Sequence, residues 1–389
     1  MKYSLDYDYL VNTLRQLVKI NSVNPSLTPG APGEVELGNY IASQLLDFEI
    51  DADIEVIATD RVNVTSLIKG SGSGPSLMLN VHMDTVGVSN MQDPFSALIK
   101  DGKLFGRGSY DTKAGIAAIL TMVKALSDNN IQFKGDLLLA FVADEEYGSI
   151  GTEHLLKKYV TDSAIVLEPT NLDICLSHKG YGLFEFTSIG KAAHGGKPQE
   201  GIDANKNMGR VMAQLDLLSD QLAQSKGHHL LGNASMHIPL IKGGSEPFTY
   251  SDNCTLLLER RTLPGETQEE ILAVYQSILD NLADSDSNFV AKVEAIMWRE
   301  PYEITQDKEI VVELNKAITQ ATDNAPAYIA HSWWEDSGLT GKAGIDTVVL
   351  GPIGAGLHTN EEWVDLESVH LLAKSLLNVS ISYLGQKAI

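Results

Sequence analysis

Cysteine and long apolar runs are both scarce in this sequence. Its 389 residues include two cysteines, Cys175 and Cys254, whose spacing suits neither a metal-binding pair nor a disulfide framework. We therefore expect a reducing, cytoplasmic location. No stretch of about 18 apolar residues occurs, so no segment is expected to span a membrane. The first 20 residues lack the basic start, apolar run and small-residue cleavage site of a secretory signal.

Positive charge is also in short supply. Lysine and arginine total 29 against 51 aspartates and glutamates, which gives a formal net charge of −22. Such a surface repels phosphate backbones and anionic lipids, so we expect neither a nucleic-acid nor a membrane partner. The acidity itself is read as a solubility adaptation.

Short apolar segments alternate with helical periodicity through much of the chain. This pattern predicts an α/β fold in which a mostly parallel sheet is flanked by helices. The expected strands are Ser76–His82, Asp136–Ala143, Ala164–Leu167 and Thr347–Leu350. The expected helices include those around Leu10–Val18 and Leu37–Leu45, together with Ala114–Leu126, Ile310–Ala321 and Glu367–Leu384.

The pattern changes after Cys175. Gly182–Ile189 alternates like a half-exposed strand, and further strands are expected at Thr255–Arg261 and Phe289–Met297, with helices at Asp203–Gln224 and Gln268–Ala283. This predicts a smaller α+β domain, residues 177–298, inserted into a discontinuous domain of residues 1–176 and 299–389.

Side chains of the kinds that bind metals follow the expected strands. In the order histidine, aspartate, glutamate, glutamate, histidine, they are His82, Asp111, Glu146, Glu168 and His358. Ligands of open α/β sheets bind where strands end, so these residues are expected to converge. Two imidazoles and three carboxylates suit two Zn²⁺ ions, which a shared carboxylate would hold about 3.5–4 Å apart. Asp84, two residues after His82, can accept its free ring N–H.

Five stretches make the sequence recognisable. They are His82-Met83-Asp84-Thr85-Val86, Gly106-Arg107-Gly108 with Asp111-Thr112-Lys113, Asp144-Glu145-Glu146 with Gly148, Glu168-Pro169-Thr170, and His358-Thr359-Asn360-Glu361-Glu362-Trp363. With these stretches the chain resembles the dinuclear zinc aminoacylase and carboxypeptidase family. That family includes acetylornithine deacetylase, succinyl-diaminopimelate desuccinylase and carboxypeptidase G. The resemblance implies a zinc-exopeptidase-like larger domain.

The resemblance also implies roles for these residues. His82 and Glu168 would bind one zinc, Glu146 and His358 the other, and Asp111 would bridge them. Asp84 would orient His82, and Glu145 would act as the general base. A glutamate at the position of Glu168 accompanies deacylases and carboxypeptidases in the family, whereas an aspartate accompanies aminopeptidases. Cobalt or manganese could replace zinc in such a site.

In the family, the inserted domain is a lid that usually forms a homodimer. His194, in GKAAHGGKP, matches a histidine that reaches the partner subunit's active site. Arg261 matches an arginine that receives a substrate carboxylate, a task for which its planar fork is suited. Its neighbour Arg260 is expected to be a surface charge. Two places depart from the family pattern: Pro247–Ser251 replaces Asn-x-x-Pro, and Gly87 replaces a proline.

The function expected from the resemblance is hydrolysis of the amide bond of an N-acyl amino acid, with acetylornithine deacetylase-like activity favoured. Succinyl-diaminopimelate desuccinylase-like and carboxypeptidase or dipeptidase activities on the same scaffold are alternatives within the hydrolases. A catalytically inactive amino-acid or peptide binding protein is the alternative outside them.

Overall fold

The computed structural model describes residues 3–387, and the chain divides into two compact units. Unit 1 comprises the described parts of Met1–Leu176, Ile304–Ile329 and Glu335–Ile389. Unit 2 comprises Ser177–Glu303 and Ala330–Trp334, so it interrupts unit 1 along the chain. Among residues 3–387, no helix is both long and apolar enough to cross a bilayer.

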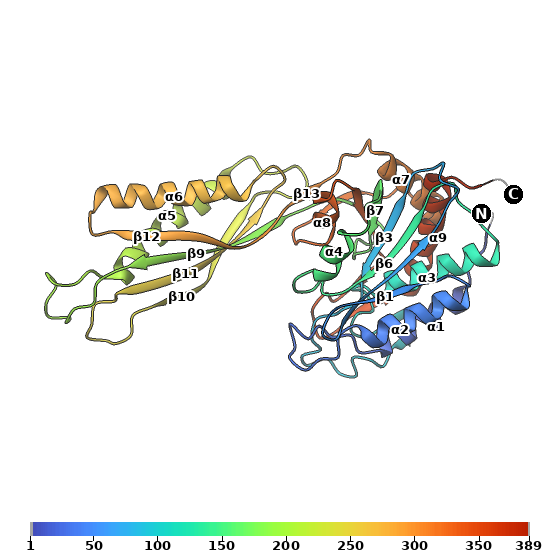
Figure 1. Ribbon diagram of the computed structural model, residues 1–389, viewed down its shortest axis with the longest axis horizontal. Coiled ribbons are helices and arrows are strands. Elements are labelled where there is room, and N and C mark those ends of the chain that lie inside the picture. Colours follow the sequence, from blue (N-terminus) through green and yellow to red (C-terminus); the bar gives the residue numbers. More distant parts are fainter. Residues whose placement is uncertain (1–2, 388–389) are drawn as a thin grey trace. The chain divides into compact units, whose positions relative to one another are not determined.

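Four parallel strands form the centre of unit 1 (Figure 1). Their order is β6 (Leu137–Val142), β3 (Leu77–His82), β7 (Ser163–Val166) and β15 (Asp346–Val349). Nearly every residue of these strands is buried, as the continuous apolar runs predict for strands covered on both faces. The expected α/β class with a mostly parallel sheet is therefore confirmed.

Antiparallel strands extend this sheet at both ends. β2 (Arg61–Ile68) pairs with β6, and β1 (Asp53–Ala58) pairs with β2. At the other end β8 (Ile174–His178) pairs with β15, and both β13 (Tyr302–Glu303) and β14 (Tyr328–His331) pair with β8.

Helices cover the two faces of the central strands. They are α1 (Tyr7–Lys19), α2 (Val35–Asp47), α3 (Lys113–Asp128), α4 (Ile150–Leu155), α7 (Glu309–Thr322), α8 (Ser337–Lys342) and α9 (Leu366–Leu384). α3 lies so close to the sheet that a Cβ added at Gly115 would be 3.2 Å from the Val81 side chain. On the opposite face, Leu155 of α4 packs with Met78 and Leu138. Leu10, Leu14, Leu17 and Val18 give α1 the buried stripe that their spacing predicts.

A small antiparallel sheet joins distant parts of unit 1. Its order is β16 (Gly354–Ala355), β17 (Trp363–Asp365), β5 (Lys103–Phe105) and β4 (Leu98–Lys100). Trp363 is opposite Phe105, so the loop after β5 and the loop before β17 are brought together. These two loops carry Asp111 and His358.

Unit 2 is a four-stranded antiparallel sheet packed against two helices. The strand order is β10 (Ser235–Gly243), β11 (Asn253–Thr262), β9 (Gly180–Ile189) and β12 (Val290–Arg299). The helices α5 (Ala204–Gln224) and α6 (Gln268–Ser285) cover a core in which Tyr275 meets Phe184 and Phe186 edge to face. Thr267 and Glu270 close the start of α6 with a capping box.

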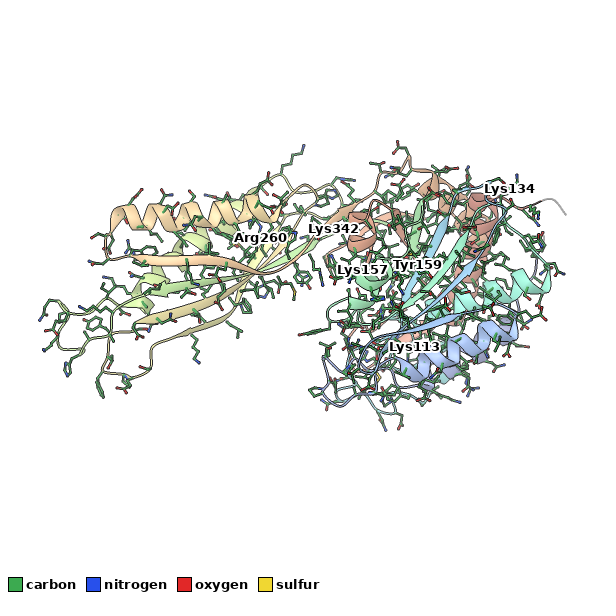
Figure 2. All side chains as sticks on the ribbon, viewed as in Figure 1. Lys113, Lys134, Lys157, Tyr159, Arg260 and Lys342 are labelled. Atoms are coloured by element: carbon green, nitrogen blue, oxygen red, sulfur yellow. The ribbon has the colours of Figure 1, made fainter. Side chains whose placement is uncertain are left out.

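The expectation that Arg260 is a surface charge is wrong. Its exposed fraction is 5%, it lies on β11 within unit 2 (Figure 2), and its guanidinium is paired with Glu266. Alternation explains the difference, because neighbouring residues of a strand point to opposite faces. Arg260 faces the core side of the sheet and Arg261 the more exposed side.

Candidate metal centre

The carboxyl ends of the parallel strands bring the predicted ligands together. His82 is the last residue of β3, Glu168 lies two residues after β7, and Glu146 follows β6 by four residues. These strands are parallel neighbours, so their carboxyl ends share one edge of the sheet. This edge is the ordinary ligand position in open α/β folds.

His82, Asp111 and Glu168 form a first group of possible metal ligands. His82 Nε2 lies 3.1 Å from Asp111 Oδ1 and 3.4 Å from Glu168 Oε1. All three side chains are buried. One nitrogen and two carboxylate oxygens within this distance are a donor set that suits a divalent cation such as Zn²⁺.

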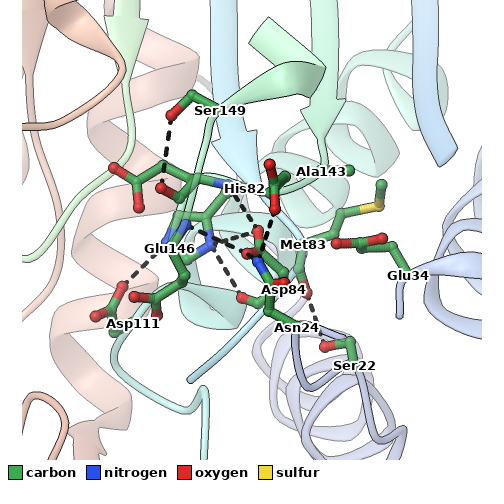
Figure 3. A network of polar contacts seen from close by, with 12 residues as sticks. Ser22, Asn24, Glu34, His82, Met83, Asp84, Asp111, Ala143, Glu146 and Ser149 are labelled. Atoms are coloured by element: carbon green, nitrogen blue, oxygen red, sulfur yellow. Dashed lines mark hydrogen bonds and ion pairs between the residues drawn. The ribbon is translucent and has the colours of Figure 1, made fainter. Parts of the chain in front are cut away.

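Asp111, Glu146 and His358 form a second group. His358 Nε2 lies 3.0 Å from Glu146 Oε2 and 3.4 Å from Asp111 Oδ2. Asp111 therefore directs one carboxylate oxygen to each histidine, so it belongs to both groups (Figure 3 shows His82, Asp111 and Glu146). His358 differs from His82 in exposure, with 56% of its side-chain surface accessible.

Acidic charge is concentrated among these side chains. Burial raises the pKa of Glu168 well above its ordinary value and that of Glu146 to about 7. Hydrogen bonds to Asp111 and Glu146 raise the pKa of His358 to about 10. Burial opposes ionisation of Asp111, but its contacts with His358 and His82 lower its pKa. Bound dications would neutralise this cluster of carboxylates, so the donor set fits a pair of them.

His82 is held in the orientation that a ligand requires. Its Nδ1 lies 3.0 Å from the backbone oxygen of Asp84 and 3.5 Å from Asp84 Oδ1. We expected the carboxylate to accept the ring N–H, and the structure places the carbonyl of the same residue nearer. With the proton on Nδ1, the Nε2 lone pair faces Asp111 and Glu168.

The Asp84 carboxylate connects His82 to the segment after β6 (Figure 3). It accepts the backbone N–H of Glu145 at 3.1 Å and that of Glu146 at 3.3 Å. Asn24 donates to it at 2.7 Å and to Asp144 at 3.0 Å. One amide group therefore ties the end of β3 to the turn that carries Glu145 and Glu146.

Behind Asn24 lies a buried arginine. Arg61 donates to both oxygens of Glu34, at 2.8 Å from Nε to Oε2 and 2.6 Å from Nη2 to Oε1. Its Nη1 lies 2.9 Å from Asp144 Oδ1 and 3.1 Å from Asn24 Oδ1. Sequence analysis missed Asn24, Arg61 and Glu34, because their partners lie up to 120 residues away and no local pattern marks them.

Glu145 lies beside the first group. Burial, with the charge of Glu168 and Asp336, raises the pKa of its carboxyl well above the ordinary value. The position of Glu145 is fixed through its backbone N–H on Asp84. A carboxylate at this position can take up a proton and return it.

His194 and Arg261 belong to unit 2. His194 Nδ1 accepts the N–H of Gly196 at 3.0 Å, so the proton of the neutral ring is on Nε2, in an exposed loop. Arg261 Nε lies 2.6 Å from Glu259 Oε1, and its guanidinium lies over the Tyr181 ring.

His228, His229 and Glu303 form another cluster, in unit 2, but His228 has no free ring nitrogen to offer a metal. His228 Nδ1 accepts the N–H groups of Leu230 and Leu231, which leaves the proton on Nε2. Nε2 then donates to Glu303 at 2.8 Å. Both ring nitrogens of His228 are therefore engaged in hydrogen bonds, and the cluster with His229 and Glu303 holds the loop together.

Comparisons with known proteins identify a family and several relatives. Residues 78–381 match the profile described as Peptidase family M20/M25/M40. Acetylornithine deacetylase of Myxococcus xanthus is 28% identical over 371 residues, covering 92% of this chain and 93% of that protein. N-formyl-4-amino-5-aminomethyl-2-methylpyrimidine deformylase of Bacillus subtilis is 26% identical over 393 residues, covering 92% of each. The crystal structure of aminopeptidase PepT from Bacillus cereus superposes with a TM-score of 0.80 at 19% identity, covering 96% of this chain and 98% of that one.

The resemblance to metal-dependent aminoacylases and carboxypeptidases is confirmed by the family match, which covers most of the chain. Members of this family are metallohydrolases that act on amides, through dinuclear metal sites. The alternative of a binding protein without catalysis is not better supported. The chain belongs to Peptidase family M20/M25/M40 and is a metal-dependent amide hydrolase.

Proposed function

We propose that this hydrolase removes the acyl group from an N-acyl amino acid and uses two zinc ions. The observation that carries the proposal is the pair of donor groups that share Asp111. Relatives that cover more than nine-tenths of the chain include a deacetylase and a deformylase, which both remove an acyl group from nitrogen. Glu168, where the resemblance associates glutamate with deacylases, supports the same choice over an aminopeptidase.

His82 and Glu168 would hold one metal, Glu146 and His358 the other, and Asp111 would bridge the two. When bound, two divalent cations lower the pKa of a water molecule and polarise the acyl carbonyl. Asp84 keeps the proton on His82 Nδ1 and so keeps Nε2 available. Co²⁺ or Mn²⁺ could occupy the same donor set.

Glu145 would act as the general base and then the general acid. Its carboxylate accepts the proton that the attacking water loses. It then delivers this proton to the amide nitrogen, because an amine leaves poorly as an unprotonated anion. The raised pKa of Glu145 suits both transfers.

The inserted domain predicted from the sequence, residues 177–298, would serve as a lid and a homodimer contact. His194 would donate its Nε2–H to the oxygen that becomes negative during attack, from the partner subunit if the dimer forms. Arg261 would bind the substrate carboxylate, in exchange for part of its contact with Glu259. A cytoplasmic location is part of the same proposal.

The test is a substrate panel for the full chain loaded with Zn²⁺, Co²⁺ or Mn²⁺. It would compare kcat/KM for acetylornithine, other N-acetyl amino acids, succinyl-diaminopimelate, an N-formyl aminopyrimidine and dipeptides. We expect an N-acetyl amino acid to lead the other classes by at least about tenfold, which corresponds to about 1.4 kcal/mol. Dipeptides as the best substrates would refute the deacylase assignment.

The panel also tests Arg261 through two matched substrates, N-acetylornithine and its α-carboxamide. Arg261→Ala should raise KM for the carboxylate and leave the carboxamide unchanged. Lys292→Ala, at an exposed lysine of β12, is the control. Equal effects of Arg261→Ala on both substrates would indicate a structural arginine.

A further inference from the structure

Glu362 is a buried carboxylate enclosed by the loop that carries Asp111. Its exposed fraction is 2%. Its oxygens accept backbone N–H groups from Gly108 at 3.0 Å, Tyr110 at 2.8 Å and Asp111 at 3.1 Å. Three backbone donors on one carboxylate fix the path of that loop, and the last of them belongs to Asp111 itself.

Arg107 makes the reciprocal connection. It lies in the Asp111 loop, and its Nη1 donates to Glu362 Oε2 at 2.7 Å. Its Nη2 donates to the backbone oxygen of Thr359, the residue after His358, at 2.8 Å. The exposed fraction of Arg107 is 2%. Arg107 therefore reaches from the Asp111 loop to the His358 loop, and Glu362 reaches from the His358 loop to the Asp111 loop. We call this pair the Arg107–Glu362 clamp.

The two donor groups depend on the clamp to different degrees. In the second group, Asp111 and His358 both come from clamped loops, and Glu146 alone comes from the β6 end. In the first group, His82 ends β3 and Glu168 closely follows β7, so the parallel sheet positions two of the three donors. Loss of the clamp should therefore weaken the second group more than the first.

We propose that Arg107 and Glu362 are positioning residues that set the affinity of the second metal subsite, formed by Asp111, Glu146 and His358. This inference rests on the proposed function, because it presupposes that both groups bind a metal. The pair acts through backbone and loop geometry, whereas the ligands would contact the metal. Residues behind metal ligands typically change affinity about 10–100-fold when they are replaced.

The decisive variant is Glu362→Gln. Glutamine has the same size as glutamate, but its NH₂ group would face backbone N–H groups whose hydrogen bonds a carboxylate oxygen now accepts. Glu361→Gln is the matched control, since the same chemical change is then made at the exposed neighbouring glutamate. Arg107→Lys is the second variant, because it keeps the positive charge but cannot bond Glu362 and Thr359 through a planar fork.

The experiment titrates metal-free full-length protein with Co²⁺ and follows both calorimetry and the visible absorption of the bound ion. For the native sequence we expect two equivalents. For Glu362→Gln we expect the second equivalent to bind about 10–100-fold more weakly and the first to change less than about threefold. Glu361→Gln should match the native sequence, and Arg107→Lys should show a smaller loss of the same kind.

The outcomes separate this inference from the proposed function. If the native protein binds fewer than two equivalents, the dinuclear site itself is refuted. If the native protein binds two equivalents and folded Glu362→Gln binds both normally, or loses both equally, the clamp is refuted. Circular dichroism checks the fold of each variant. If Glu362→Gln does not fold, Arg107→Lys decides by the same criterion.

Discussion

At the scale of single residues, Glu145 and Glu146 are neighbours in the chain with two different proposed roles. Glu146 faces His358, whereas burial and the charges of Glu168 and Asp336 raise the pKa of Glu145. Their backbone N–H groups share the carboxylate of Asp84. The same anchor therefore holds a candidate ligand and a candidate base at a fixed spacing.

Replacement of the candidate base should stop turnover and leave the metal in place. We expect Glu145→Gln to lower kcat by about 10²–10⁴-fold, the usual size of a general acid–base contribution. Metal content measured by atomic emission should equal that of the native protein. The comparison variant, Glu146→Gln, should lose metal, and a similar loss in Glu145→Gln would mean that its role is misassigned.

The exposed histidine of unit 2 is tested by its effect on kcat. If His194 donates to the developing oxyanion, His194→Ala should lower kcat by about 10²–10³-fold with full metal content. His229→Ala changes another exposed histidine of unit 2 and serves as the control. A rate equal to that of the native protein would remove His194 from the mechanism.

The five candidate ligands lie together as the strand order predicts, and their roles as ligands stay a prediction. His82, Asp111, Glu146, Glu168 and His358 could be grouped because each lies near the end of a strand or in a loop that follows one. Asn24 and Arg61 could not be found in this way. Their hydrogen bonds depend on how the loop after α1 folds against β2 and β3, and no periodicity records that packing.

At the scale of elements, α3 begins with a buried lysine. The exposed fraction of Lys113 is 1%, and its Nζ donates to the backbone oxygen of Ile20 at 2.7 Å (Figure 2 marks its position). Burial lowers its pKa to about 7. The amine thus ties the start of α3 to the end of α1. Burial of the protonated amine costs free energy of folding, and this cost depends on pH because the neutral amine carries no charge.

This cost predicts a pH dependence of folding stability. Below pH 7 the amine is protonated in both states and the folded state carries the full penalty. Between about pH 7 and 10.5 the unfolded state binds more protons, so the free energy of unfolding should rise with pH, by at most about 5 kcal/mol. Urea unfolding of chelator-treated protein at pH 7, 8 and 9 measures it.

Lys113→Met supplies the comparison, because methionine has no proton to lose. The free energy of unfolding of the native protein should increase with pH relative to that of this variant. Parallel pH profiles for the two proteins would show that burial does not perturb the amine.

Element prediction worked best for buried segments. The strands β3, β6 and β7 and the helices α1, α3 and α9 lie within a few residues of their expected ranges. No residue range was predicted for β10, and its residues explain why. It is an edge strand, most of its side chains are exposed, and Pro239 lies where its pairing with β11 shifts register.

At the scale of the whole molecule, both donor groups lie in unit 1, whereas unit 2 has a hydrophobic core of its own. Metal binding should therefore stabilise the two units unequally. A ligand at 100 times its Kd adds about 2.7 kcal/mol to the state that binds it.

Hydrogen exchange with and without a chelator tests this division. Metal removal should speed exchange in β3, β6, β7 and the loops of Asp111 and His358, and leave α5, α6 and β11 unchanged. Chelator-treated protein to which Zn²⁺ has been restored is the control. Equal loss of protection in both units would show that the metals stabilise the molecule as one folding unit.

The insertion of unit 2 has a consequence for biosynthesis. β17, which pairs with β5, and the loop of His358 lie more than 250 residues beyond β5. A ribosome must therefore complete all of unit 2 before the second donor group can exist. From residue 168 until His358 is added, the nascent chain carries His82, Asp111, Glu146 and Glu168 but lacks the last donor, so full capacity for two ions arises only after unit 2 has been made.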